Sequence, residues 1–348
     1  TEDATVDAGP VTPDAGPPRS IVFVHTNDEH SHQLGFGPEV DDVPPAGPGS
    51  GLEGGLLRRS VVIERIRAEA STLGSGSALV SSGDQTMGSL FHLANPSRGI
   101  DYAVATLLGY DALTLGNHEF DFGAGQLASA LRAGGVDVTG NPGILQIPVV
   151  VSNIRFSGSS ADDDTLSNLY ATAGDATHPL RRTFIKTHRG VRVGYLGLLG
   201  LEASYYAPFK RPVRFSMATD NTACTTDAQC GGAPCLPPAT DPLATAGTCA
   251  INADESDPRH FAALVADAAL AVAELRAQNV DLVVALAHVG VDERELATLE
   301  AMGLPASEAR SSEEILLAKG VSQVLAAQGL HGIDVIVGGH SHTALQRP

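Results

Sequence analysis

Two pairs of metal-ligand residue types occur in this sequence at a spacing of two residues. Asp28 and His30 lie in "HTNDEHSH", and His340 and His342 lie in "GGHSHT". Residues two apart on an extended segment point to the same side, so each pair could chelate one ion. Aspartate oxygen and imidazole nitrogen together suit divalent cations such as Zn, Mn, Fe or Co. The chemistry indicated is therefore metal-ion chemistry.

The same residue types follow other apolar runs in the chain. Asp84 follows one run, Asn117 and His118 follow a second, and His288 follows a third. A lone histidine is more often a core or surface residue than a ligand. Five strand ends that each deliver such residues favour one shared site, because ligand sites of open α/β sheets gather at the carboxyl ends of strands.

The elements that would position these residues alternate between short apolar strands and segments of helical periodicity. The predicted strands are residues 21–24, 78–80, 112–115, 149–153, 191–199, 282–287 and 335–337. The predicted helices are residues 56–73, 100–108, 259–278 and 314–328. This alternation indicates an α/β fold in which helices cover the faces of the sheet.

Composition and charge narrow the class of protein. The 348 residues are 43% apolar, enough for a substantial core. The formal charge of −18 argues against a nucleic-acid surface, because phosphate backbones are bound chiefly by clustered Lys and Arg. The acidity fits either a solvated surface or carboxylates that hold cations. No run reaches the ~18 to 20 uncharged apolar residues of a transmembrane segment.

Residues 1–19 form an acidic tract of Pro, Gly, Ala and Thr with the near-repeat "VDAGP" and "PDAGP". Such a tract cannot bury enough apolar surface to offset the entropy of ordering it. We interpret it as a disordered, flexible tether at the mature end of an exported or lipid-anchored protein. The predicted location is extracytoplasmic, in the periplasm, secreted or anchored at the surface of a bacterium.

All four cysteines fall in one segment rich in Gly, Pro, Thr and Ala, at positions Cys224, Cys230, Cys235 and Cys249. The segment shows neither helical nor strand periodicity. We expect two disulfides that staple a surface loop in place of a structural zinc site, which implies an oxidising compartment. Of the three pairings, we favour the local one, Cys224 with Cys230 and Cys235 with Cys249.

Several motifs together resemble the calcineurin-like metallophosphoesterases, and specifically the N-terminal catalytic domain of the 5′-nucleotidase family. They are "VHTNDEHSH", "EGGLLRR", "SSGDQTMGS", "LGYDALTLGNHEFDFG", "LAHVG" and "IDVIVGGHSHT". The pair "GNHEFD" and "GGHSHT" is highly specific. The resemblance implies a four-layer α/β/β/α sandwich over residues 20–348, with insertions at about 34–53, 220–256 and 291–312. It also implies that a C-terminal nucleoside-binding domain lies outside this chain.

The resemblance further implies two divalent metal ions, with Zn or Mn preferred and Fe or Co as alternatives. The implied ligands are Asp28, His30 and His342 for the first ion, Asn117, His288 and His340 for the second, and Asp84 for both. A shared carboxylate and a bridging hydroxide would reduce the repulsion between two dications. That hydroxide would attack phosphorus in line with the leaving group.

Within "GNHEFD", His118 and Asp121 match the family's catalytic dyad. A histidine near the metals can stabilise the transferring phosphoryl group or protonate the leaving alkoxide, and the aspartate can fix its tautomer. The alternative is that "NHEFD" caps the next helix. We expect a structural role for Glu119, and we place His32 and His92 at the surface or beside the ligands.

The expected function is hydrolysis of small-molecule phosphate esters, with nucleotides as the main candidates. The same motifs serve 2′,3′-cyclic-nucleotide phosphodiesterases, nucleotide pyrophosphatases and thiosulfohydrolases, which stay as alternatives. A non-catalytic surface binding module would also keep the fold. A non-catalytic module is expected to have lost some of the metal-ligand residues, whereas all seven positions here carry residues able to bind a metal ion.

Overall fold

The computed structural model describes residues 19–35, 54–136, 140–290 and 313–342. The predicted tether, up to residue 18, lies outside these ranges. So do most of the predicted insertion over 34–53 and all of the insertion over 291–312. These three assignments, and the domain boundaries that depend on them, stay predictions.

The first of two central sheets is wholly parallel and has the strand order β1-β2-β3-β6-β7. Its strands are β1 (Ile21–Thr26), β2 (Gly76–Ser81), β3 (Ala112–Leu113), β6 (Val149–Val150) and β7 (Leu180–Arg181). Parallel strands buried on both faces read as continuous apolar runs, which is why the sequence signals them clearly. Three of the five strands, β1 to β3, lead into candidate ligand loops.

The second central sheet has the strand order β14-β13-β9-β8. Its strands are β8 (Thr183–His188), β9 (Val191–Leu199), β13 (Leu282–His288) and β14 (Val335–Gly338). Three strands are parallel, whereas β8 pairs antiparallel with β9. The sequence did not predict β8, because its exposed middle residues break the apolar run.

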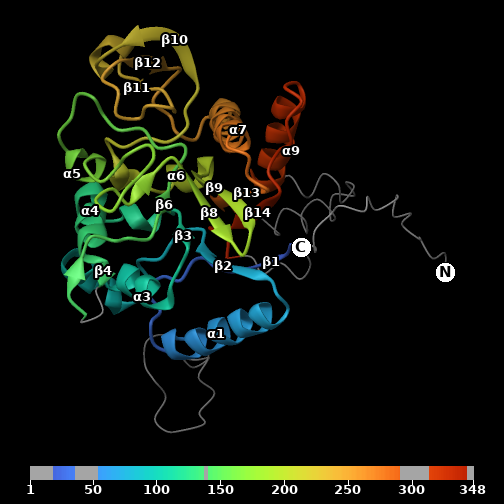
Figure 1. The fold of residues 1–348 in the computed structure, drawn as a ribbon. Helices are drawn as coiled ribbons and strands as arrows, with labels where there is room; N and C mark the ends of the chain where they lie inside the picture. Colours follow the sequence, from blue (N-terminus) through green and yellow to red (C-terminus); the bar gives the residue numbers. More distant parts are fainter. Residues whose placement is uncertain (1–18, 36–53, 137–139, 291–312, 343–348) are drawn as a thin grey trace, which may run out of the picture.

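The two sheets face each other and helices cover their outer faces (Figure 1). Between the sheets, Val80 and Val150 of the first pack with Tyr195, Leu286 and Val337 of the second. One outer face carries α1 (Leu56–Thr72), α3 (Ile100–Leu108) and α4 (Gly123–Ala133), and the other carries α7 (Phe261–Ala277) and α9 (Glu313–Ala326). The predicted four-layer α/β/β/α sandwich is therefore confirmed.

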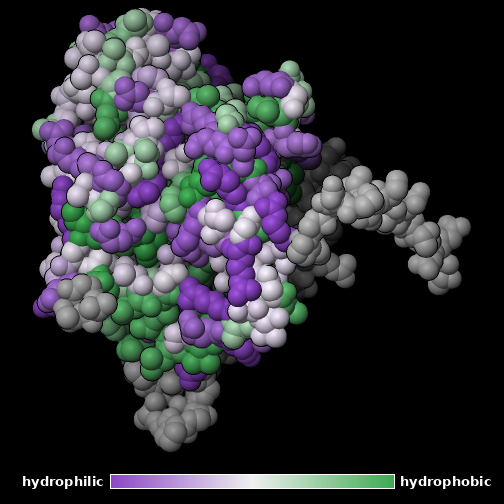
Figure 2. All heavy atoms as spheres, in the orientation of Figure 1, coloured by the Kyte–Doolittle hydropathy of each residue, from purple (hydrophilic) through white to green (hydrophobic). Residues whose placement is uncertain are grey.

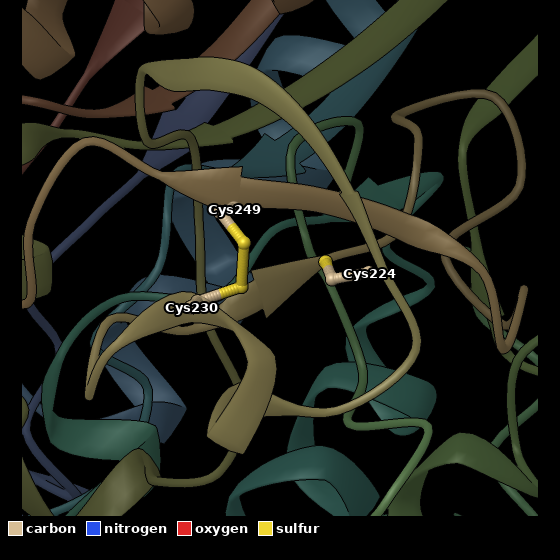
Figure 3. Close-up of side chains that lie close together, drawn as sticks. All are labelled: Cys224, Cys230 and Cys249. Carbon is tan, nitrogen blue, oxygen red and sulfur yellow. A yellow bond between two sulfur atoms is a disulfide. The ribbon is translucent and has the colours of Figure 1, made fainter.

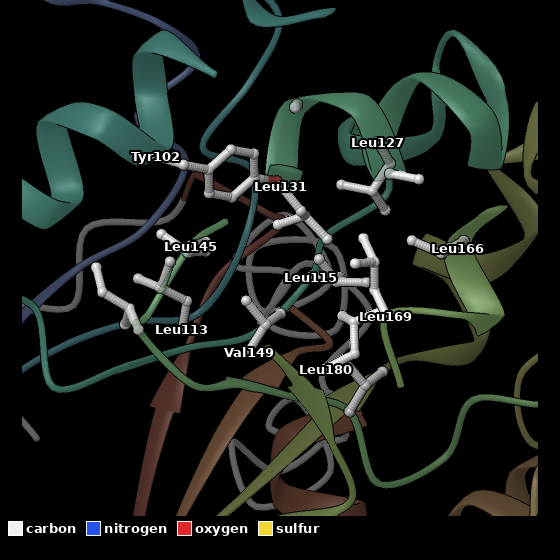
Figure 4. Packing of buried hydrophobic residues seen from close by; sticks show 14 of the residues in the cluster. Tyr102, Leu113, Leu115, Leu127, Leu131, Leu145, Val149, Leu166, Leu169 and Leu180 are labelled. Atoms are coloured by element: carbon white, nitrogen blue, oxygen red, sulfur yellow. The ribbon is translucent and has the colours of Figure 1, made fainter. Parts of the chain in front are cut away.

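The largest apolar cluster lies between the first sheet and its helices (Figure 4). Leu113 and Val149 from the sheet meet Leu127 and Leu131 from α4, and all four are at most 3% exposed. Burial of an aliphatic side chain of this size contributes roughly 1.5 to 3 kcal/mol. This cluster anchors α4 and, through it, the loop between β3 and α4 that carries the candidate dyad.

The remaining described elements are short. They are α2 (Asn95–Arg98), α5 (Asp164–Ser167), α6 (Leu201–Tyr205), the β4–β5 pair (Gly135–Val136 and Pro142–Gly143), and 3₁₀ turns at Leu90–Ala94, His118–Phe120, Pro208–Lys210, Asp227–Cys230 and Pro258–His260. Over the described ranges, no helix has both the length and the apolar character that a membrane crossing needs. Figure 2 shows apolar side chains gathered over the start of α1, where Leu57 and Val61 are exposed.

The cysteine segment forms a small antiparallel sheet, which the sequence had indicated only as a loop. Its strand order is β10-β12-β11, with β10 at Thr219–Cys224, β11 at Cys235–Leu236 and β12 at Gly247–Ala250. Met217, Ala233, Leu236 and Ala250 make a separate small core beneath it. The sheet lies at the top of the molecule in Figure 1, away from the strand ends that carry the candidate ligands.

Two disulfides hold this sheet, as predicted, but the favoured pairing is wrong. One bond joins Cys224 to Cys235. The other joins Cys230 to Cys249 and is shown in Figure 3. The local pairing treats the segment as two successive loops. Instead, the 3₁₀ turn that ends at Cys230 packs back onto β12, which brings Cys230 to Cys249. Disulfides form and persist in oxidising environments.

Candidate metal centre

The seven candidate ligands come together at the carboxyl ends of five strands, three from the first sheet and two from the second. Asp28 and His30 follow β1, Asp84 follows β2, Asn117 follows β3, His288 ends β13, and His340 and His342 follow β14. Because the two sheets lie face to face, their strand ends open onto the same edge of the sandwich. The convergence expected from the sequence is present.

Asp28, His30 and His342 form the first group, with one potential ligand atom from each within 4.8 Å of the others. The two imidazole Nε2 atoms are 2.9 Å apart, and His342 Nε2 lies 3.5 Å from Asp28 Oδ1. The side chain of His342 is 58% exposed. This group therefore lies on the solvent side of the centre.

Asp84, His288 and His340 form a second group with the same spread of ligand atoms. His288 Nε2 is 3.1 Å from Asp84 Oδ2. The side-chain oxygen of Asn117 lies 3.1 Å from His288 Nε2 and 3.0 Å from His340 Nδ1. The amide oxygen of Asn117 is thus placed among the same nitrogen atoms, and this group is buried.

Asp84 lies between the two groups. Its Oδ2 atom is 3.1 Å from His288 Nε2 and 4.0 Å from His30 Nε2, and the side chain is 1% exposed. Burial disfavours its charged form, but the neighbouring His288 and His118 outweigh that effect and lower its pKa to about 2. Asp84 is therefore an anion in contact with both sets of imidazoles.

The tautomer of His288 is set by the first sheet. Its Nδ1 atom lies 2.8 Å from the backbone carbonyl oxygen of Ser82. A carbonyl oxygen can only accept, so Nδ1 donates this hydrogen bond. Nε2 then faces Asp84 and Asn117, which is the arrangement typical of a metal-binding histidine.

The backbone of the candidate ligands is strained. Five of the seven adopt positive φ angles: Asp28 (51°), His30 (47°), Asp84 (53°), His340 (86°) and His342 (52°). This region is uncommon for residues other than glycine, and each instance costs roughly 1 to 3 kcal/mol. Such strain clusters at functional sites, where the surrounding structure must enforce it.

Hydrogen bonds between loops enforce this conformation. The backbone amide of His30 donates to the carbonyl oxygen of Asp84, and that of Asp28 donates to the carbonyl oxygen of Gly83. The amide of His340 donates to both carboxylate oxygens of Asp28, at 3.0 and 3.1 Å. Loops from both sheets are thereby fixed to one another.

Glu119 contributes a contact that the sequence did not reveal. Its buried carboxylate accepts hydrogen bonds from the backbone amides of Gly116 (2.6 Å), Asp84 (3.0 Å), Gln85 (2.8 Å) and Thr86 (3.2 Å). Burial, and then the charge of Asp84, raises the pKa of Glu119 to about 7. The structural role expected for Glu119 holds, and the loop it shapes is the one that carries Asp84.

Two motif glycines allow close approaches at the centre. A Cβ atom on Gly116 would lie 2.1 Å from Asp84 Oδ1, and one on Gly338 would lie 1.8 Å from Glu314 Oε1. Neither distance is sterically possible. The glycines of "GNHE" and "GGHSHT" therefore leave room for carboxylates.

His118 and Asp121 form a hydrogen-bonded pair beside the two groups. His118 Nδ1 is 2.7 Å from Asp121 Oδ2, and this bond raises the pKa of His118 to about 9. The ring of His118 lies 5.0 Å from that of His30, and its ligand atom also comes within 4.8 Å of His30 and Asp84. The next helix, α4, has Phe122 at its N-cap without a side-chain capping bond, so capping does not explain the pair.

His32 and His92 belong to none of the groups of clustered ligand atoms among the described residues. His32 Nδ1 lies 3.2 Å from the carbonyl oxygen of Glu29. His92 contacts the carbonyl oxygen of Ser89, and its ring stacks on Phe122 with centroids 5.6 Å apart. Both are part-buried and lie near the centre, as expected.

The donor set fits divalent ions. It combines carboxylate oxygen, amide oxygen and imidazole nitrogen, the ligand types that suit Zn, Mn, Fe and Co. In each of the two groups of candidate ligands, the potential ligand atoms lie within 4.8 Å of one another.

Comparisons with known proteins identify relatives of this chain. No protein-family model matches the chain. The 5′-nucleotidase of Rattus norvegicus is 30% identical over 151 residues, which cover 43% of this chain and 23% of the relative. The chain thus matches about a quarter or less of the length of such curated relatives.

Two solved structures share the fold. The 5′-nucleotidase precursor of Thermus thermophilus aligns with a TM-score of 0.52 at 23% identity, over 93% of this chain and 42% of its own. The calcineurin-like phosphoesterase YfkN of Bacillus subtilis aligns with a TM-score of 0.51 at 18% identity, over 94% and 73%. Together, the sequence relatives and the shared fold support a place for this chain beside the N-terminal domain of the 5′-nucleotidase family of metallophosphoesterases.

Proposed function

We propose that this protein is a two-metal phosphoesterase that hydrolyses phosphate esters, with nucleotides as its main substrates. The observation that carries the proposal is the sharing of Asp84 between two groups of ligand atoms, one with His30 and one with His288. A single cation would not need two such groups. A bridging carboxylate between two sets of donors is the arrangement that holds a pair of dications.

In this proposal the ligands divide as the family pattern implies. One ion would be held by Asp28, His30 and His342 and the other by Asn117, His288 and His340, and Asp84 would serve both. When bound, such ions act as Lewis acids toward a phosphoryl group and lower the pKa of a nearby water. The strained loops and the fixed tautomer of His288 pre-organise the donors for this task.

His118 supplies the proton for the leaving group. Its Nδ1 is engaged by Asp121, which leaves Nε2 as the atom that can carry and release a proton. Because Asp121 raises the pKa of His118 to about 9, the imidazole is protonated near neutral pH. A cation at this position stabilises charge on the phosphoryl oxygens and can protonate the alkoxide as the ester bond breaks.

Nucleotides are proposed as substrates because curated relatives carry the name 5′-nucleotidase. Hydrolysis of 2′,3′-cyclic nucleotides or of nucleotide pyrophosphates remains the alternative within the family. A binding module without catalysis is disfavoured, because seven donor residues converge and five of them have strained backbones. A binding module has no need to maintain that strain.

The two disulfides support an extracytoplasmic location, in the periplasm, secreted or at the surface of a bacterial cell. Within such a compartment the substrates would be small phosphate esters from outside the cytoplasm. A downstream domain that grips the nucleoside, as the family resemblance implies, would add to their recognition.

The proposal is tested by metal analysis together with a phosphate-release screen. We expect two equivalents of divalent metal per chain after loading with Zn²⁺ or Mn²⁺. We also expect release of inorganic phosphate from nucleotides or simple monoesters, or opening of a cyclic nucleotide to its monophosphate, which chromatography detects. A protein that binds two ions but hydrolyses none of these compounds would support the binding module instead.

A further inference from the structure

The loop after β1, residues 28–33 (the ligand loop), contacts the rest of the protein on two sides. Asp28 and His30 belong to the first group of candidate metal ligands. Ser31 and Gln33 are instead buried in the interior and are 0% and 7% exposed. Buried polar side chains almost always have hydrogen-bond partners inside the protein. The partners of these two side chains therefore hold the ligand loop from behind.

Asp101, in the first turn of α3, is the shared partner of these two side chains. Its carboxylate accepts hydrogen bonds from Ser31 Oγ and Gln33 Nε2, each at 2.7 Å, and from Asn95 Nδ2 at 2.5 Å. Asp101 is 2% exposed, and burial of a carboxylate is costly unless several donors satisfy it. Asp101 therefore fixes Ser31, whose neighbour in the chain is His30.

Glu29, also on the ligand loop, is held by a second helix. Arg59 of α1 forms an ion pair with the carboxylate of Glu29, and Tyr110 Oη donates a hydrogen bond to Glu29 Oε1 at 2.7 Å. The side chains of Glu29 and Arg59 are 8% and 18% exposed, so solvent screens their ion pair less than it screens a pair at the surface. Arg59 Nη2 also donates to Gln33 Oε1 at 3.4 Å. Arg59 therefore contacts the ligand loop at two positions.

The motif "EGGLLRR" has no part in the proposed ligand set, although the sequence singles it out. Arg59 is its last residue. Gly55 of the same motif has a φ angle of 83°, and a Cβ atom there would lie 2.4 Å from the backbone nitrogen of Gly35. Only glycine permits so close an approach. The motif thus brings the start of α1 against the chain just beyond the ligand loop, and from there Arg59 reaches Glu29.

We propose that Arg59 and Asp101 are positioning residues that hold the ligand loop in the conformation that presents its two ligands to the first ion. The inference rests on the proposed two-metal function. Asp28, His30 and Ser31 have φ angles of 51°, 47° and 56°, which the loop would not favour by itself. The buried contacts behind the loop help to offset that strain. Because the ligands of the second ion lie on other loops, the effect of the two residues is confined to the first ion.

The test measures the affinity for each ion in variants of these two residues. Asp101→Asn places an NH₂ group where a carboxylate oxygen accepts, so at least one of the three donors loses its acceptor. Arg59→Met removes the ion pair with Glu29 and keeps much of the length of the side chain. The metal-free full chain is titrated with Zn²⁺ in a calorimeter. We expect the affinity for one equivalent to fall about 10- to 100-fold in both variants and the affinity for the other to stay unchanged.

Two matched variants test whether the effect is specific to the ligand loop. Arg58→Met changes the neighbouring arginine, which is exposed on α1, and should keep both affinities. Asp267→Asn changes another buried carboxylate, 8% exposed, that accepts hydrogen bonds from Arg155 and Ser216. It should lower the Tm about as much as Asp101→Asn and still keep both affinities. An equal loss of Zn²⁺ affinity in Asp101→Asn and Asp267→Asn would show general destabilisation and would overturn the inference.

Visible absorption of bound Co²⁺ adds a readout of the coordination geometry. We expect the spectrum of one equivalent to change in Asp101→Asn and Arg59→Met, and Arg59→Lys, which keeps the charge, should restore part of it. If Asp101→Asn does not fold, the comparison of Arg59→Met with Arg58→Met decides the question.

These measurements separate the inference from the proposed function. Selective weakening of one ion, in a protein that hydrolyses no ester, would defeat the catalytic proposal alone. Unchanged affinities for both ions in Asp101→Asn and Arg59→Met, in a protein that does hydrolyse esters, would overturn the inference alone.

Discussion

The carboxylate of Glu119 accepts a hydrogen bond from the backbone amide of Asp84 at 3.0 Å. The same carboxylate accepts from the amide of Gly116 at 2.6 Å. Glu119 therefore joins the loop after β2 to the loop after β3. Because Asp84 and Asn117 lie on these two loops, the distance between two candidate ligands depends on a side chain that is not itself a candidate ligand.

Replacement of Glu119 by glutamine tests this connection. The amide NH₂ group would face backbone donors in place of a carboxylate oxygen, so two or more of the four hydrogen bonds would be lost. We expect metal affinity to fall about 10- to 100-fold, as for other residues that orient ligands, and stability to fall by roughly 2 kcal/mol. Isothermal titration with Zn²⁺ and thermal unfolding measure both. Glu69→Gln, at an exposed position of α1, should change neither.

Asp84→Ala removes the carboxylate that the two ligand groups share. We expect loss of at least one of two metal equivalents and a fall in kcat of more than about a thousandfold, because each remaining group keeps only its own donors. Metal content by mass spectrometry and phosphate release are measured on the same sample. A variant that keeps two ions and most of its activity would refute the assigned bridge.

His118→Ala should separate catalysis from metal binding. His118 Nδ1 is committed to Asp121, and the proposed role of the imidazole is toward the leaving group. We expect both ions to be retained while kcat falls about 100- to 10,000-fold, the usual contribution of a general acid. The loss should be smaller for an ester with an acidic phenol, which needs no proton. Loss of an ion in this variant would instead make His118 a ligand.

The strands and helices that carry the site could be predicted because their signals are local. The helix at residues 100–108 and the strand at 191–199 agree in both bounds with α3 and β9. The ends of these runs, with Asp, His and Asn directly after them, also indicated where the site would form. Apolar periodicity over a few residues is sufficient for such assignments.

Features that depend on contacts between distant segments could not be predicted. The pairing of Cys230 with Cys249 follows from a three-stranded sheet whose strand order no local pattern gives. The positive φ angles of Asp28 and Asp84 arise from hydrogen bonds between loops. The role of Glu119 depends on four backbone amides, three of which are more than 30 residues away. A local sequence pattern indicates which residue types are present. These three features depend instead on which distant segments lie next to one another in the folded protein.

The disulfide assignment predicts the behaviour of the cysteines. Thiol titration of the unfolded, unreduced protein should find no free thiol, and peptide mapping should recover Cys224 joined to Cys235 and Cys230 joined to Cys249. Removal of either bond should destabilise the small sheet by roughly 3 kcal/mol, because loops of this length lose that much unfolded-state constraint. Reduction should leave the metal content unchanged. Release of an ion on reduction would show that the cysteines bind metal.

Glu314 should make the folded protein less stable as the pH rises. Most carboxyl groups have the opposite effect, because their pKa is lowered by folding. Burial raises the pKa of Glu314 to about 7 from an ordinary value near 4.5. The folded state therefore favours the protonated form. The contribution of this group to stability is full below pH 4.5 and is lost as the pH rises through about 7.

Glu314→Gln removes this titration while it keeps the size of a side chain that packs against Gly338 of β14. We expect the Tm of the variant relative to the unmodified protein to rise by about 2 to 4 °C between pH 5 and pH 8, the equivalent of ~1 kcal/mol in a domain of this size. Both proteins are measured by calorimetry at equal Zn²⁺ load, with Glu69→Gln as the exposed control. A Tm difference that stays constant across this range would show that Glu314 is ionised in the folded protein, with a carboxylate held next to Gly338.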